Sequence, residues 1–394
     1  MSFKRELLVS FGLQGTGAAA ILLATLWLGV SLGPEAQGIF SHIKAEIEFI
    51  SAFAMFGLPQ ALFFYAKSGR LNSIAASRWA FGCALLALLL GAIYSQWSGQ
   101  TGEITIALSC AAAIVTVHGI FRALLLVHDR AIWFNISTTL PQVLVFIGVG
   151  IAIAYGGINA TGWSLLFVLA YISVTMLTGW RLYLKPIRAS ESLVKWNALI
   201  YYGGANWLAA ALIAAAILFA QRWVDVTQGR TALGQFTMGM TLVQIPLTPV
   251  NYAGPLLFRR WMDLPGEKPN RIIIALIFIV LLVVALMLWS IARIWPDLWL
   301  GSAYNGVARV LAILVAGGAA EAASRILAVQ VNARGVPWIT VCAESSRWVV
   351  LVLGWVFLKT QTLEWICAVW ALGAWAAAGL YMALMQTDAL KKAT

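Results

Sequence analysis

The stretch GVARVLAILVAGGAAEAASRILAVQVNARG, from Gly306 to Gly335, decides the fold class of this chain. It is mostly apolar over the roughly 20 residues that a membrane-spanning helix needs, but Glu321 and Arg325 lie one helical turn apart within it. A charge at membrane depth costs several kcal/mol unless an opposite charge or water compensates it. The stretch therefore predicts a membrane helix whose charged side chains face protein or a water-filled space.

The composition of the whole chain is that of an integral membrane protein. Hydrophobic residues make up 61% and charged residues 10% of the 394 residues, against about 45–50% and about 25% in soluble proteins. The apolar runs are longer than the strands of a membrane β-barrel, which have about 10 residues. We count about twelve runs and predict an all-α fold with transmembrane helices at residues 9–32, 39–66, 77–97, 104–127, 132–155, 163–184, 199–221, 233–258, 272–295, 306–333, 337–357 and 365–385.

Most lysines and arginines lie in the connections on the side that holds both chain ends, which predicts that both termini are cytoplasmic. The net charge of +11 follows largely from this asymmetry and does not indicate nucleic-acid binding. Lys4 and Arg5 precede an apolar run too long for a signal peptide, so this run is expected to stay as the first span. The four cysteines lie in separate apolar runs, which argues against a disulfide framework, a metal site or redox chemistry; no cofactor is predicted.

The chain contains traces of an internal duplication. When it is shifted by 196 positions, GIF at residues 38–40 falls on GQF at residues 234–236, and Pro59 falls on Pro255. Because each half then holds an even number of spans, the repeats are predicted to be parallel, and such repeats commonly enclose a site at mid-membrane. We therefore predict two parallel six-helix lobes around a central cavity, residues 1–190 and 191–394.

Four segments resemble a known family. LGPEAQGIF (residues 32–40), GLPQALFFYAKSGR (57–70), RALLLVHDR (122–130) and AESSRW (343–348) are similar to the Wzx-type polysaccharide flippases of the multidrug/oligosaccharidyl-lipid/polysaccharide exporter superfamily. The resemblance implies two lobes that open alternately to each side of the bacterial inner membrane. It implies a substrate too: undecaprenyl-diphosphate-linked oligosaccharide units, as used for the O-antigen of lipopolysaccharide, moved from the cytoplasmic to the periplasmic leaflet.

The same resemblance implies how the protein would work with its surroundings. Cationic side chains in the cavity would bind the diphosphate, the prenyl tail would stay among membrane lipids, and a proton or sodium ion would drive transport. A polymerase and chain-length proteins would act next and are candidate partners. The predicted substrate-binding residues are Lys44, Arg122, Arg222, Glu321, Arg325, Glu344 and Arg347.

The charges of the C-terminal half allow two interpretations. Since a short turn joins two consecutive helices, Arg325 is expected level with Glu344, and Glu321 nearly level with Arg347. The four side chains either neutralise each other between the helices or line a cavity and rearrange when substrate or a coupling cation arrives. In the second case Glu321 and Glu344 are the carboxylates able to carry a proton or Na⁺.

Arg122 differs because no acidic residue is expected beside it. Residues equally far from the cytoplasmic turn near Arg130 lie at similar depth on the two helices, so Arg122 is expected beside Thr138 and Thr139. His118 lies one turn away on the same helix as Arg122. An unpaired arginine at this depth either extends its side chain to the lipid headgroups or awaits an anion. Guanidinium suits phosphate because its planar fork donates two parallel hydrogen bonds.

The segment FSHIKAEIEF begins the second predicted helix with charges on opposite faces. The i, i+4 spacing pairs His42 with Glu46 and Lys44 with Glu48. Charged residues on all faces of this segment predict that it projects above the membrane into solvent. Alternatively, the segment is a gate at the periplasmic opening of the cavity, to which Arg222 also contributes. Further on, QIPLTPVNYAGP holds three prolines and predicts a bent helix that Asn251 lines.

Two other classes of function stay open. A drug or organic-cation antiporter of the same superfamily is expected to need an intramembrane carboxylate in the N-terminal half, and five of its six predicted spans contain none. A membrane glycosyltransferase or polymerase would need acids and bases on a sizeable external loop, and these loops are short. The chain has no Walker-type GKS or GKT motif, so we predict a transporter and not an enzyme.

Overall fold

The computed structural model describes residues 3–99, 102–128, 132–157, 159–188, 194–263, 278, 281–287, 289–290, 293, 302–304, 306–358 and 362–386. Every regular element in these ranges is a helix, and nine of the helices are long and apolar enough to cross a membrane. The prediction of an all-α, multi-pass membrane protein is confirmed. The predicted span at 272–295 lies mostly outside the described residues.

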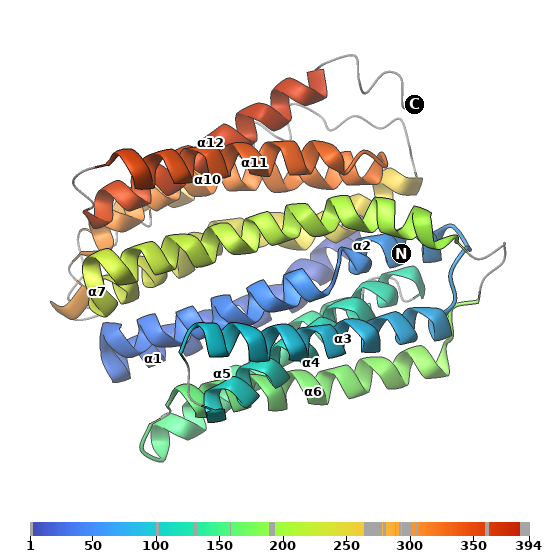
Figure 1. The fold of residues 1–394 in the computed structure, drawn as a ribbon, viewed down its shortest axis with the longest axis horizontal. Helices are drawn as coiled ribbons and strands as arrows, with labels where there is room; N and C mark the ends of the chain where they lie inside the picture. The colour runs from blue at the N-terminus through green and yellow to red at the C-terminus, as the bar shows by residue number, and fades with distance from the viewer. Residues whose placement is uncertain are drawn as a thin grey trace. The chain divides into compact units, whose positions relative to one another are not determined.

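From α1 to α7, and again from α10 to α12, the helices follow one another along the chain with short connections (Figure 1). They are α1 (Phe3–Ala54), α2 (Leu58–Lys67), α3 (Ser73–Trp97), α4 (Gly102–His128), α5 (Ile132–Ala154), α6 (Ala160–Leu184), α7 (Trp196–Asp263), the 3-10 helix η1 (Ser302–Tyr304), α10 (Val307–Ala333), α11 (Trp338–Phe357) and α12 (Leu363–Gln386).

Helices α1 and α7 each join two predicted spans through a single glycine in place of a loop. Gly33 has φ 81° and ψ 175°, and Gly229 has φ 80° and ψ 176°. A side chain would strain this positive φ, whereas glycine adopts it readily. The two glycines lie 196 positions apart, the same shift that aligns the sequence repeat, so the backbone supports the predicted duplication.

Two compact units divide the chain. The first unit contains the chain up to Ala24 and from His42 to Ala215, and the second contains Thr25–Ser41 and the chain from Ala216 onward. Each of α1 and α7 therefore contributes to both units. The lobe boundaries 1–190 and 191–394 stay a prediction.

In the first unit α4 packs against α2, α3, α5 and α6, and small buried residues such as Ala111 and Ala112 line it. The turn between α1 and α2 packs onto the first part of α7, where Gly57, at φ 65°, lies against the backbone of Gly203. Trp207 Nε1 donates a hydrogen bond to the Phe53 carbonyl at 2.8 Å. Backbone packing and aromatic contacts thus hold this part of the unit together.

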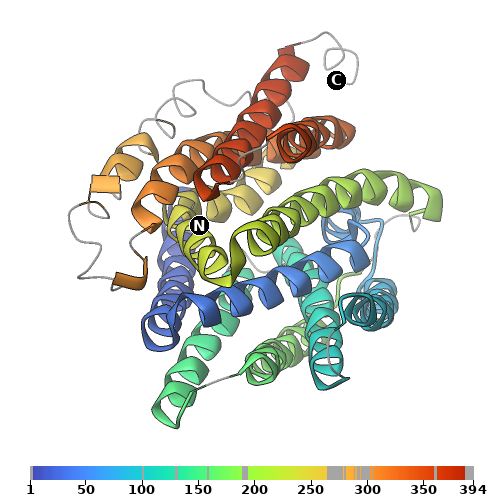
Figure 2. The ribbon, with the colours of Figure 1, turned by 60° about the vertical axis from the view of Figure 1, so that its left-hand side comes forward.

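In the second unit α10 packs against α11 and α12, which Figure 2 shows in orange and red. Alanines at 320, 323, 374 and 378 form a buried cluster between α10 and α12. Gly38 of α1 and Gly234 of α7, which are equivalent in the sequence repeat, allow the two helix backbones to come close together. Small residues at such crossings permit the close van der Waals packing that associates membrane helices.

Candidate functional site

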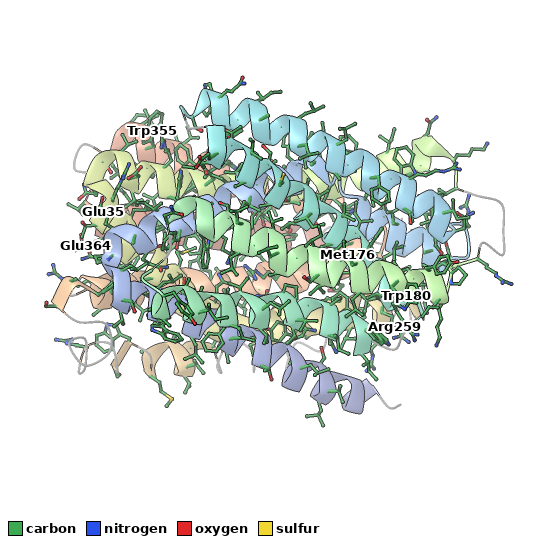
Figure 3. The ribbon with its side chains drawn as sticks, turned by 90° about the horizontal axis from the view of Figure 1, so that it is seen from below. Glu35, Met176, Trp180, Arg259, Trp355 and Glu364 are labelled. Carbon is green, nitrogen blue, oxygen red and sulfur yellow. The ribbon has the colours of Figure 1, made fainter. Side chains whose placement is uncertain are left out.

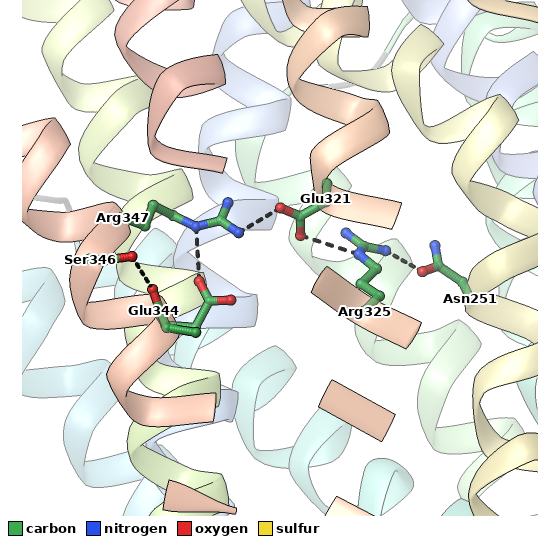
Figure 4. Close-up of polar contacts among 7 residues, drawn as sticks. Asn251, Glu321, Arg325, Glu344, Ser346 and Arg347 are labelled. Atoms are coloured by element: carbon green, nitrogen blue, oxygen red, sulfur yellow. Dashed lines mark hydrogen bonds and ion pairs between the residues drawn. The ribbon is translucent and has the colours of Figure 1, made fainter. Parts of the chain in front are cut away.

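A cluster of four charges lies inside the second unit, between α10 and α11 (Figure 4). Glu321 on α10 accepts a hydrogen bond from Arg347 on α11 at 2.6 Å and another from Arg325 at 3.2 Å, one on each carboxylate oxygen. The Arg347 Nε atom also lies 2.8 Å from Glu344 Oε2 as an ion pair. The expected approach of Glu321 to Arg347 is therefore present.

The expected approach of Arg325 to Glu344 is not among the ion pairs of the described residues. Arg325 instead donates a hydrogen bond to the side-chain oxygen of Asn251 on α7. The reason is that Glu321, one turn away on the same helix, already holds the Arg325 guanidinium in place. Asn251 was expected at a bend of its helix, and it serves here as the neutral end of the cluster.

Burial separates the members of this cluster. The side chains of Glu321, Glu344 and Arg347 are only 6%, 3% and 2% exposed, whereas that of Arg325 is 32% exposed. Gly373 on α12 leaves room for the Arg347 side chain. Two acids and two arginines give no net charge, so the cluster is compensated internally, and Arg325 is its accessible member.

Arg122 in the first unit has no such compensation. Its guanidinium lies over the ring of Phe134 on α5, 5.4 Å from the ring centre, and its buried Nε atom has no hydrogen-bond partner. Among the described residues no ion pair includes it. The hydroxyls of Thr138 and Thr139, which were expected beside Arg122, donate to the backbone carbonyls of Phe134 and Leu13.

Other polar side chains surround Arg122 in the first unit. His118, one turn earlier on α4, is 3% exposed and packs edge-on against Tyr171 of α6 at 5.1 Å. The Tyr171 hydroxyl in turn interacts electrostatically with Arg122. Neither neighbour is an acidic residue, so neither compensates the charge of Arg122.

A buried polar cluster that was not predicted from the sequence lies between α1 and α5. Ser10, Gln14 and Asn135 are at most 3% exposed; Ser10 and Gln14 both donate to Asn135 Oδ1, and Gln14 also donates to Ser10. The i, i+4 spacing of Ser10 and Gln14 within an apolar span was the signal that could have revealed it. Such hydrogen bonds join membrane helices to each other.

The two remaining predicted site residues are exposed. Lys44 lies 3.6 Å from Glu48, with side chains 44% and 54% exposed, and Arg222 lies 3.8 Å from Asp225. The prediction of a turn solvated on all faces is wrong for Glu46, which is 1% exposed and lies 3.5 Å from His42. One face of this turn packs against protein, so only the face of Lys44 is solvated.

Charges at the ends of the second unit are also paired and exposed. Glu35 lies 3.8 Å from Arg230, and Glu364 lies 3.6 Å from Arg309. Figure 3 shows Glu35 and Glu364 at one end of this unit and Arg259 at the opposite end. In the part of the chain that the structure describes, no three His, Cys, Asp or Glu side chains lie close enough to hold a metal ion.

These features define a multi-pass helical membrane protein of two units, with a neutral charge cluster in one and an uncompensated arginine in the other. Solved structures give the fold. An inward-facing multidrug resistance MATE family transporter of the MOP superfamily matches with a TM-score of 0.70 and 16% identity, over 98% of this chain and 99% of that chain. An outward-facing one matches with a TM-score of 0.71 and 17% identity, over 100% and 97%.

A third match is a MOP superfamily transporter from Pyrococcus furiosus, described as having a binding pocket of reversed polarity that suggests a different function. Its TM-score is 0.70 at 17% identity, over 99% of this chain and 97% of that chain. No protein-family model and no curated protein matches the chain in sequence. The chain thus has the fold of the MATE transporters of the MOP superfamily, and these matches do not distinguish the Wzx-type subfamily.

Proposed function

We propose that this chain is a membrane transporter that works by alternating access. The observation that carries the proposal is its fold, which is similar over nearly the whole chain to transporters captured facing inward and facing outward. The two helices that contribute to both units, α1 and α7, share a repeated backbone break, at Gly33 and Gly229. A duplicated architecture of this kind suits a rocking movement of one half against the other.

For the substrate we propose a lipid-linked oligosaccharide whose diphosphate contacts Arg122. The guanidinium is partly buried, its Nε atom is unpartnered, and no acid among the described residues neutralises it. An anion that binds to Arg122 would accept two charge-assisted hydrogen bonds from the guanidinium, at a position where water competes poorly. On this proposal the protein is a flippase of the bacterial inner membrane with both termini in the cytoplasm, coupled to an ion.

A second candidate is a cation-coupled drug or organic-cation antiporter, and the comparisons favour it over the flippase. The matched transporters are described as multidrug resistance proteins. Glu46 adds a specific observation, because it belongs to the one N-terminal span that contains carboxylates and is buried in the first unit, where it was expected to be solvated. The sign of the substrate's charge therefore separates the two candidates.

Native mass spectrometry of the detergent-purified protein tests both candidates. We expect an undecaprenyl-diphosphate sugar on the wild type, none on Arg122→Ala and partial retention on Arg122→Lys, because lysine keeps the charge without the bidentate geometry. Arg181→Ala is the matched control, since Arg181 also stacks on an aromatic ring, at 5.1 Å from Trp133. Equal lipid binding by Arg122→Ala would remove Arg122 from the site, and selective binding of hydrophobic cations would replace the flippase by the antiporter.

A further inference from the structure

The two carboxylates of the charge cluster are not equally compensated. Glu321 accepts one hydrogen bond on each oxygen, from Arg347 at 2.6 Å and from Arg325 at 3.2 Å. Glu344 has Arg347 as its ion-pair partner, and although Nε and Oε2 lie 2.8 Å apart, they are not aligned as a hydrogen bond. Buried ionised groups need aligned donors, so neutralising Glu344 costs the cluster less than neutralising Glu321.

A buried tyrosine from a third helix packs against Ala343, the residue before Glu344. Tyr381 of α12 is 0% exposed within an apolar cluster that includes Leu327, Val331 and Ala343. Its hydroxyl interacts electrostatically with Glu344 but makes no aligned hydrogen bond in the structure. A buried O–H without an aligned acceptor is costly, so this hydroxyl has an unused capacity to donate a hydrogen bond.

Polar side chains continue from Tyr381 to the turn between α10 and α11. The Tyr381 hydroxyl also interacts with Thr340, which is 4% exposed near the start of α11. Thr340 Oγ1 lies 3.5 Å from Asn332 Oδ1, and Asn332 is partly exposed in the last turn of α10. Small side-chain rotations would join these groups into a hydrogen-bonded route that a proton can follow.

The surroundings of Glu344 suit a proton better than a metal ion. A hard cation needs several oxygen ligands that carry most of the negative charge. The groups that face Glu344 are Arg347 beside it on α11, Glu321 and Arg325 on α10, and Tyr381 on α12. Two arginines repel a metal cation at this position, whereas a proton binds directly to a carboxylate oxygen and needs no further ligand.

We propose that Glu344 is the proton-binding site of this protein, supplied through Tyr381 and Thr340 from the turn between α10 and α11, while Glu321 stays ionised between its two arginines. Water at the turn gives up the proton, and a Glu344 carboxylate oxygen takes it. The cluster then changes from no net charge to one positive charge. The role of this site in transport rests on the proposed function, but the site itself does not.

The charge change links proton binding to substrate binding in a direction that depends on the substrate. Linkage is reciprocal, so a ligand that prefers the positive cluster also promotes protonation. An anionic lipid diphosphate near the accessible Arg325 binds more tightly as the pH falls. An organic cation at the same place binds more weakly as the pH falls, which is the behaviour that a proton antiporter needs.

Carbodiimide labelling of the wild-type protein tests the proton site without any substrate. Dicyclohexylcarbodiimide reacts with protonated carboxyl groups in apolar surroundings, and peptide mass spectrometry locates the adduct. We expect the adduct on Glu344 and not on Glu321, with several-fold more labelling at about pH 5 than at about pH 8, because only the protonated carboxyl group reacts. Equal labelling of Glu321, or none on Glu344 at either pH, overturns the proposal.

Infrared difference spectra provide the second test. The protonated-carboxyl band that appears on acidification should be lost in Glu344→Gln and kept in Glu321→Gln, and its persistence in a folded Glu344→Gln variant overturns the assignment. Tyr381→Phe keeps the ring and removes the hydroxyl, so hydrogen–deuterium exchange of the band should slow several-fold; an unchanged rate overturns the route. If the labelling succeeds and no diphosphate lipid binds, the flippase fails and the proton site stands.

Discussion

Arg122 and Arg347 are both arginines of the membrane-spanning part of the chain, but their surroundings are opposite. Arg347 is 2% exposed and lies between Glu321 and Glu344 in the second unit. Arg122 has only the Phe134 ring and neutral neighbours in the first unit. A buried arginine that is paired with carboxylates already uses its hydrogen-bond donors within the protein, whereas an unpaired arginine can still donate to a ligand. The contrast separates the charges that hold the protein together from those available to a substrate.

The largest effect should come from replacing each arginine by methionine. Arg347→Met leaves Glu321 and Glu344 buried without a shared cation, and the loss of one partner of a buried pair costs about 3–5 kcal/mol. Arg122→Met removes an uncompensated charge, so the free energy of unfolding should change by less than about 1 kcal/mol or increase. Thermal unfolding in detergent, followed by loss of the monodisperse peak, measures both. Equal losses would mean that Arg122 has a structural partner as well.

A second substitution tests whether packing, and not charge, holds the first unit. Gly57→Ala places a Cβ atom against the Gly203 carbonyl at φ 65°. The left-handed conformation and the overlap together should cost about 2–4 kcal/mol. Gly12→Ala is the matched control, because its Cβ meets no atom within 4 Å, and alanine in a helix should gain up to about 1 kcal/mol. If Gly57→Ala left the stability unchanged, the backbone of the turn between α1 and α2 would have to move at little energetic cost.

Much of the fold could be predicted from the sequence because membrane spans depend on length and hydropathy. The spans at 77–97, 104–127 and 132–155 correspond closely to α3, α4 and α5. The predicted loop after the first span was not found, since Gly33 lets one helix run into the next through a single residue. Hydropathy does not detect such a junction, whereas a glycine followed by proline was a local signal for it.

The candidate site was predictable only where its members share a helix or a short turn. The spacing of Glu321 and Arg325 and the turn leading to Arg347 are local, and these contacts are present. The contact of Arg325 with Asn251 joins α10 to α7, and the approach of Tyr381 to Glu344 joins α12 to α11. Contacts between distant segments depend on how helices pack, which a single sequence does not encode in its periodicity.

The smallest effects on stability are expected for substitutions of the exposed cations Lys44 and Arg222. Because these substitutions should not disturb folding, their effect on lipid binding tests the gate hypothesis directly. Lys44→Gln and Arg222→Gln each break a solvent-exposed pair, at 3.6 Å and 3.8 Å, and such pairs contribute about 0–1 kcal/mol. Thermal unfolding should therefore be nearly unchanged, while Glu46→Gln, at a buried position one turn from His42, should lower stability measurably. Because folding is unaffected, any loss of lipid binding by Lys44→Gln reports directly on the substrate. Full binding by both exposed variants would restrict the anion site to the cations inside the protein, Arg122 and Arg325.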